Sequence, residues 1–78
     1  MTTETEMLIG QAAEEACEIA QALSKIQRFS FLHSPPGRTE TNLELLEIEL
    51  SDLETILCHI EARTGLDIKR EVYNPPIS

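Results

Sequence analysis

Aromatic residues are scarce in this sequence, which has no tryptophan, two phenylalanines and one tyrosine among 78 residues. Its core must therefore be built from aliphatic side chains. A chain this short buries only about 60% of its unfolded surface, so a lone monomer is expected to be marginally stable. A disulfide, a metal or a partner subunit would add the missing stability. The length allows one domain.

Basic residues are also few. Six lysines and arginines stand against 14 acidic residues, which gives a formal net charge of −8. Nucleic-acid-binding domains draw much of their affinity from basic side chains that neutralise phosphates, so no nucleic-acid partner is expected. A polyanionic ligand is expected to bind through a cation that the protein holds.

The sequence has only two cysteines and no long apolar run. Cys17 and Cys58 make no disulfide framework, and neither has a second cysteine or a histidine at zinc-ligand spacing. No apolar stretch approaches the roughly 20 residues of a membrane span. The acidic N-terminus lacks the charged-then-apolar order of a signal peptide. We expect a reduced, cytoplasmic protein with no membrane partner.

Helical periodicity dominates what is present. Apolar residues recur at positions i, i+3, i+4 and i+7 over residues 4–29 and 42–63, which predicts two long helices. A Pro-Pro-Gly run makes residues 30–41 a loop. A short third helix is expected over 67–73, followed by a tail over 74–78. Nothing in the pattern predicts strands.

The ends of the second helix carry capping signals. Asn42 is expected as its N-cap, with Thr41 and Thr39 as alternatives, and Gly65 stands just past its end. The predicted fold is all-α, with two long antiparallel helices and a short C-terminal one. Because two helices cannot bury both sides of such wide apolar faces, we expect a four-helix bundle formed by homo-oligomerisation rather than a lone hairpin.

Some acidic residues fall on apolar faces of these helices. At about 100° per residue, Glu49 lies inside the apolar face of the second helix and Asp52 lies on its edge. On the first helix, Glu15 is flanked by apolar residues, Glu18 lies nearer the rim and Glu14 faces the far side. Each pair, Glu15 with Glu18 and Glu49 with Asp52, stacks on one stripe of its helix. In an antiparallel arrangement the two stripes can face each other.

Facing carboxylates repel and are costly to bury. Protonation with raised pKa values, salt bridges or divalent cations would each relieve the cost. Mg²⁺ and Mn²⁺ prefer such hard oxygen ligands. A di-iron centre is disfavoured because the sequence has no Glu-x-x-His. The alternative to a metal site is a set of solvated helix edges, with Glu49 snorkelling to solvent or paired across an interface.

The two acidic stripes also form a pair of motifs. Residues 14–18 read E-E-x-x-E and residues 49–52 read E-x-x-D, on two helices joined by a loop. This pair resembles the MazG-like, all-α nucleoside triphosphate pyrophosphohydrolases, a group that includes the dimeric dUTPases and the phosphoribosyl-ATP pyrophosphohydrolases. The resemblance covers roughly residues 7–67. Residues 19–29 look like the continuation in small, phage-type members, which would place the protein in the host cytoplasm.

The resemblance implies a reaction, a cofactor and an assembly. The enzyme would hydrolyse a (deoxy)nucleoside triphosphate between its α- and β-phosphates, giving the monophosphate and pyrophosphate, with a deoxynucleotide, and a purine base, slightly favoured. It would need Mg²⁺, with Mn²⁺ as a substitute, and would form a homodimer or homotetramer. The metal ligands and catalytic acids carried over are Glu15, Glu18, Glu49 and Asp52. Glu14 would support the metal ligands or activate water, or would simply be solvated.

Residues that would contact the substrate phosphates complete the prediction. Lys25 and Arg28, near the end of the first helix, are candidate substrate-binding residues, and Lys69 and Asn74 loosely match a downstream lysine and asparagine that family members use. All of these side chains are equally compatible with an ordinary solubilising surface. The alternative function is a catalytically inactive or regulatory helical interaction module with the same fold.

Overall fold

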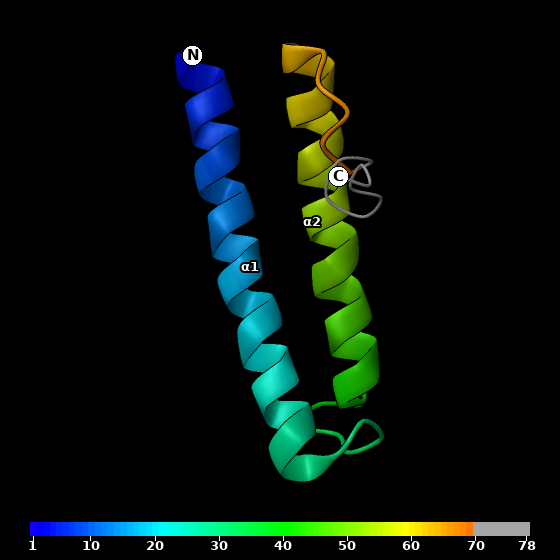
Figure 1. The fold of residues 1–78 in the computed structure, drawn as a ribbon. Helices are drawn as coiled ribbons and strands as arrows, with labels where there is room; N and C mark the ends of the chain where they lie inside the picture. Colours follow the sequence, from blue (N-terminus) through cyan, green and yellow to red (C-terminus); the bar gives the residue numbers. More distant parts are fainter. Residues whose placement is uncertain (70–78) are drawn as a thin grey trace, which may run out of the picture.

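A computed structural model describes residues 1–69 of the chain, which form two helices packed side by side as an antiparallel hairpin (Figure 1). Helix α1 spans Thr3–Phe29 and helix α2 spans Asn42–Thr64. These bounds differ from the predicted ones by one residue at the start of α1 and one at the end of α2. No strand occurs among the described residues, so the predicted all-α class is confirmed.

The third element lies at the limit of the described chain. Ile68 and Lys69 have helical backbone, but the rest of the short helix expected over 67–73 and the whole tail over 74–78 lie outside the described residues. Neither described helix combines the length and apolar character that crossing a membrane requires.

The start of α2 corrects the predicted N-cap. Thr41, not Asn42, caps the helix: its hydroxyl accepts the Glu44 backbone N–H at 3.2 Å, and the Glu44 carboxylate accepts the Thr41 N–H at 3.2 Å. This reciprocal pair is a capping box. Asn42 stands at the first helical position, and its side-chain amide instead donates to the Ser30 carbonyl at 2.9 Å.

The other end of α2 follows the prediction. Gly65 adopts a left-handed conformation with φ 74°, and its N–H donates to the Glu61 carbonyl at 2.8 Å. A residue without Cβ takes this conformation without strain, which is why glycine so often ends a helix. At the same end of the hairpin, Arg63 of α2 forms an ion pair with Glu4 of α1.

The two helices meet along a seam with heptad spacing. Buried or half-buried residues recur at alternating intervals of three and four, the pattern of packed, nearly parallel helix axes. In α1 they are Thr5, Leu8, Ala12, Glu15, Ile19, Ala22 and Ile26, and in α2 they include Asn42, Leu46, Glu49, Leu53, Ile56 and Ile60. Glu15 and Glu49 thus occupy positions that usually hold leucine or isoleucine.

The hairpin covers only part of the apolar surface. Leu46 and Ile60 are the buried hydrophobic residues of the described chain, whereas Ile9 is 42% exposed and Leu23 is 50% exposed. Ile9 and Leu23 bound a second α1 stripe, whose inner members Ala13, Ala16 and Ala20 are also exposed. This stripe has the same three-and-four spacing as the seam, and α2 does not cover it.

Candidate metal centre

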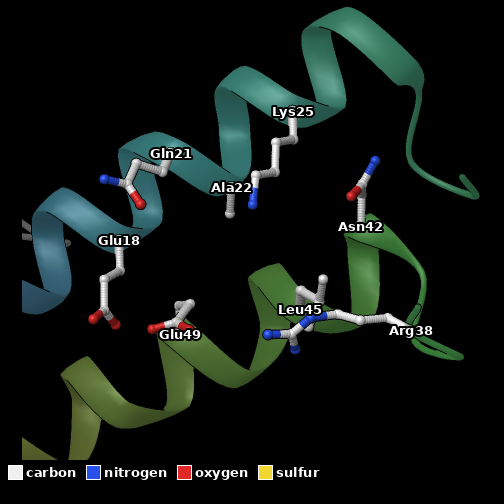
Figure 2. A pocket seen from close by; sticks show the side chains of 8 residues that line it. All are labelled: Glu18, Gln21, Ala22, Lys25, Arg38, Asn42, Leu45 and Glu49. Carbon is white, nitrogen blue, oxygen red and sulfur yellow. The ribbon is translucent and has the colours of Figure 1, made fainter. Parts of the chain in front are cut away.

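A pocket of about 230 Å³ opens along the seam toward the loop end of the hairpin (Figure 2). Residues of α1, of the loop and of α2 line it: Glu18, Gln21, Ala22, Lys25, Arg38, Asn42, Leu45 and Glu49. Figure 2 shows Glu18 and Glu49 together at one end, with Lys25 and Arg38 at the other. The pocket is therefore negative at one end and positive at the other.

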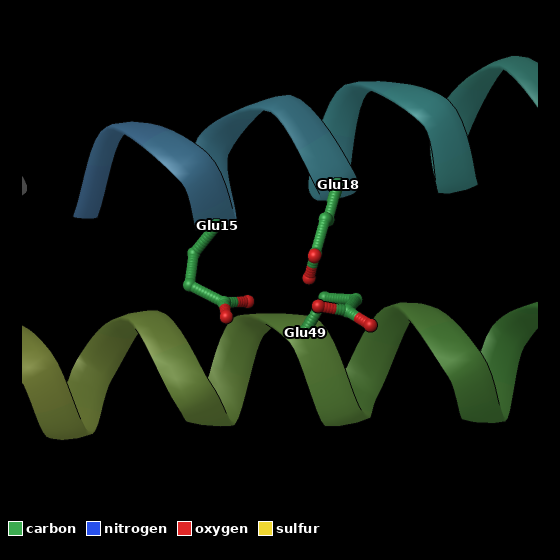
Figure 3. Close-up of side chains that lie close together, drawn as sticks. All are labelled: Glu15, Glu18 and Glu49. Carbon is green, nitrogen blue, oxygen red and sulfur yellow. The ribbon is translucent and has the colours of Figure 1, made fainter. Parts of the chain in front are cut away.

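Three carboxylates converge at the acidic end (Figure 3). Glu15 and Glu18 project from successive turns of α1, and Glu49 projects toward them from α2. One oxygen of each lies within 4.8 Å of an oxygen of the other two. The helix stripes predicted from the sequence do face each other, and they bring together three of the four predicted metal ligands.

Two of these carboxylates have an oxygen in an unfavourable environment. Glu15 and Glu49 are half-buried in the seam, and in each the Oε2 atom is buried without a hydrogen-bond partner among the described residues. A buried polar atom that loses its water contacts and gains no partner costs about 1–3 kcal/mol, and more when it is charged. Both oxygens are therefore available to bind a cation or to accept a hydrogen bond.

Glu18 is the exposed member of the cluster, and its pKa is raised. The largest causes are a hydrogen bond with the Glu49 carboxylate and the like charge of Glu49, followed by desolvation. A hydrogen bond with Glu15 lowers the pKa, and the charge of Asp52 raises it again. The raised pKa means that the neighbouring carboxylates disfavour the ionised form of Glu18.

The donor set suits a hard divalent cation. Carboxylate oxygens are the ligands that Mg²⁺ prefers, at about 2.1 Å in an octahedral shell, so two oxygens on one Mg²⁺ are about 3.0 Å apart when adjacent and about 4.2 Å apart when opposite. The 4.8 Å limit of the present cluster therefore requires a closing movement of up to roughly 1.8 Å between adjacent ligands, within the reach of glutamate rotamers. Three carboxylates leave further coordination positions for water or for phosphate oxygens.

The remaining predicted acids lie outside this cluster. Asp52 is exposed and lines a separate shallow depression on α2 with Glu44, Glu47 and Ser51, although its charge still reaches Glu18. Glu14 is exposed and contributes no oxygen to the cluster.

The predicted substrate-binding residues have separate locations. Lys25 lines the pocket. The guanidinium of Arg28 instead lies over the Phe29 ring, 5.5 Å from its centroid. Lys69 lies against the C-terminal half of α2, where its Nζ donates to Cys58 Sγ at 3.0 Å and lies 3.9 Å from a Glu61 carboxylate oxygen. Asn74 is outside the described residues.

Sequence reasoning missed Arg38. The residue belongs to the loop, where helical periodicity gives no information about side-chain direction. The available signal was local: Pro35-Pro36-Gly37-Arg38 has proline and glycine at the second and third positions of a type II β-turn. Such a turn determines where its fourth residue emerges, but not that a pocket lies beside it.

No protein-family model, curated protein or solved structure matches this chain. The functional interpretation therefore depends on the two acidic motifs and on the geometry of the residues that they bring together.

Proposed function

We propose that this chain is a Mg²⁺-dependent pyrophosphohydrolase of the MazG-like type. It would cleave a nucleoside triphosphate between the α- and β-phosphates, with deoxynucleotides favoured and purines slightly preferred. The observation that carries the proposal is the convergence of Glu15, Glu18 and Glu49, with two buried and unpartnered oxygens, in an otherwise mostly apolar seam.

The energetics of the seam support a functional reason for these acids. Replacing buried charged groups by apolar residues of similar volume is often neutral or stabilising, so stability alone does not call for glutamate at positions 15 and 49. Perturbed titratable groups that gather in a cleft are typical of functional sites. Glu18, whose pKa is raised, lies at the acidic end of the pocket.

Mg²⁺, or Mn²⁺ in its place, would supply a Lewis acid that neutralises negative charge on phosphate oxygens. Glu15, Glu18 and Glu49 would hold it. Lys25 would bind phosphate oxygens from the opposite end of the pocket. Asp52, beside the cluster, is assigned as the fourth ligand or as the group that accepts a proton from water. The exposed position of Glu14 offers no support for a direct role.

The proposed assembly is a homodimer or homotetramer built around a four-helix bundle, to which the short C-terminal helix would contribute. The uncovered α1 stripe from Ile9 to Leu23 supports it, because its three inner alanines allow another helix to approach closely. A partner helix on this stripe would bury apolar surface that the lone hairpin leaves exposed to water.

The test is to incubate the purified protein with each common NTP and dNTP and Mg²⁺ and to resolve the products by ion-exchange chromatography. Monophosphate and pyrophosphate are expected, and EDTA or Glu49→Gln should abolish both. Glu47→Gln is the matched control, because Glu47 is an exposed α2 glutamate outside the three-carboxylate cluster.

Two results would overturn the proposal. Diphosphate and orthophosphate as products would indicate a different phosphohydrolase. Absence of any product from a folded protein that still binds Mg²⁺ would favour the inactive or regulatory interaction module.

A further inference from the structure

The loop between α1 and α2 is a built structure that holds Arg38 at the pocket. The Arg38 N–H donates to the Pro35 carbonyl at 3.1 Å, and Gly37 has φ 79°. With Pro36 as the second residue, these are the features of a type II β-turn, in which glycine takes the position that requires positive φ. The turn directs the chain so that Arg38 follows it immediately.

The first turn of α2 ties this loop to the helices. The backbone N–H groups of Asn42 and Leu43 donate to the carbonyls of His33 and Phe31 at 2.8 and 2.9 Å. The Asn42 side chain, only 2% exposed, donates to the Ser30 carbonyl. Otherwise unpaired amides at a helix start are thus used to hold the loop in place. The position of Arg38 is consequently set by backbone hydrogen bonds on both sides of it.

The guanidinium of Arg38 forms no ion pair with another of residues 1–69. Among residues 1–69 the ion pairs are Arg63 with Glu4 and Lys69 with Glu61. Arg38 and Lys25 take part in neither, although both share a pocket with Glu18 and Glu49. Two cations and two carboxylates are therefore held apart across one pocket rather than collapsed onto each other (Figure 2).

A ligand that fits this arrangement presents a cation at one end and an anion at the other. A phosphate chain with a bound divalent metal has that charge distribution. The guanidinium group is planar and carries its N–H donors in a fork that matches two phosphate oxygens at once, a geometry that the lysine ammonium lacks.

We propose that Arg38 is a substrate-binding residue that holds the part of a phosphate chain farthest from the three-carboxylate cluster, with Lys25 beside it. This inference rests on the proposed function, because it takes the acidic end of the pocket as the metal end. It adds to that function a residue of the loop that recognises the phosphate chain.

The experiment measures two affinities by titration calorimetry, that of Mn²⁺ alone and that of inorganic triphosphate in excess Mg²⁺. Arg38→Gln is expected to weaken triphosphate binding at least about tenfold, since a hydrogen bond to a charged group is lost. Mn²⁺ binding should not change. Arg38→Lys should recover part of the loss because it keeps the charge without the fork.

Arg63→Gln is the matched control. Arg63 is also an exposed arginine, but it pairs with Glu4 at the end of the hairpin away from the loop and does not line the pocket. The variant should leave triphosphate affinity unchanged. An equal weakening in Arg63→Gln would mean general charge attraction and would overturn the assignment of Arg38.

The two proposals fail in different ways. If the wild type binds Mn²⁺ and triphosphate, and Arg38→Gln binds triphosphate equally tightly, only the role of Arg38 is overturned. If the wild type binds no divalent metal, the proposed function is overturned and the role of Arg38 with it. Far-ultraviolet circular dichroism of each variant confirms that the helices are retained.

Discussion

Glu15 of α1 and Glu49 of α2 meet across the helix seam, and a carboxylate oxygen of one lies within 4.8 Å of a carboxylate oxygen of the other. Each residue also has an Oε2 atom that is buried without a hydrogen-bond partner among the described residues. The seam residues that flank them in each helix include Ala12, Ile19, Leu46 and Leu53. The two glutamates therefore lie in a part of the seam whose neighbouring residues are apolar.

This pair should destabilise the metal-free fold. Replacing both residues by leucine, in the variant Glu15→Leu/Glu49→Leu, is expected to raise the free energy of unfolding by at least about 1 kcal/mol, because it removes desolvated charge and completes the apolar seam. Urea unfolding in EDTA measures the change. Glu47→Leu, on an exposed position, should give no comparable gain. A loss of stability in the double variant would show that the two carboxylates hold the hairpin together.

Binding of Mg²⁺ should reverse the penalty. At a free Mg²⁺ concentration of 100 Kd, linkage stabilises the folded state by about 2.7 kcal/mol. For a chain of this size, at about 4–8 °C per kcal/mol, that corresponds to a rise in Tm of roughly 11–22 °C. Scanning calorimetry at fixed protein concentration and constant ionic strength measures it. Glu49→Gln should show no rise, whereas a rise as large as that of the wild type would remove Glu49 from the metal site.

The stability of the metal-free protein should depend on pH through Glu18. Its pKa is raised by Glu49, so the folded state keeps this proton to a higher pH than the unfolded state does. Protonated Glu18 therefore contributes to folding stability. This contribution is complete below the pKa of Glu18 in the unfolded state and is lost as pH rises through its raised pKa in the folded state.

Thermal unfolding in EDTA across the acidic range tests the direction of this effect. The wild type should lose Tm relative to Glu18→Gln as pH rises from acid toward neutral. Glu14→Gln, one turn away and outside the cluster, should follow the wild type. A difference in Tm between the wild type and Glu18→Gln that stays constant with pH would mean that the neighbouring carboxylates do not raise the pKa of Glu18 in solution.

The Asn42 side chain should matter for stability more than its position at a helix end implies. Asn42→Ala removes the hydrogen bond to the Ser30 carbonyl, and a polar group left unsatisfied by such a change typically costs about 1–3 kcal/mol. Thr39→Ala, in the exposed part of the same loop, should change the free energy of unfolding by less than about 0.5 kcal/mol. Chemical denaturation of the two variants compares them, and equal effects would mean that the Asn42 side chain does not anchor the loop.

Local sequence patterns determined most of the secondary structure. The repeat of apolar residues predicted both helices to within one residue at each end, because a helix forms from contacts between residues three and four apart. The same periodicity predicted that Glu15, Glu18 and Glu49 lie on facing stripes. Gly65 was predictable as a helix end because the left-handed conformation there depends on one residue alone.

Tertiary packing decided the rest. The wide apolar face of α1 did not reveal whether Leu8 or Ile9 would enter the seam, because a stripe of this width offers more than one register to a partner helix. Thr41 became the N-cap because the Asn42 side chain is engaged by the Ser30 carbonyl, 12 positions away in the chain. Arg38 lines the same pocket as Glu18 and Glu49 because the packing of the two helices places the loop at the end of this pocket. Each of these outcomes depends on groups that are distant in sequence and come together only when the two helices pack.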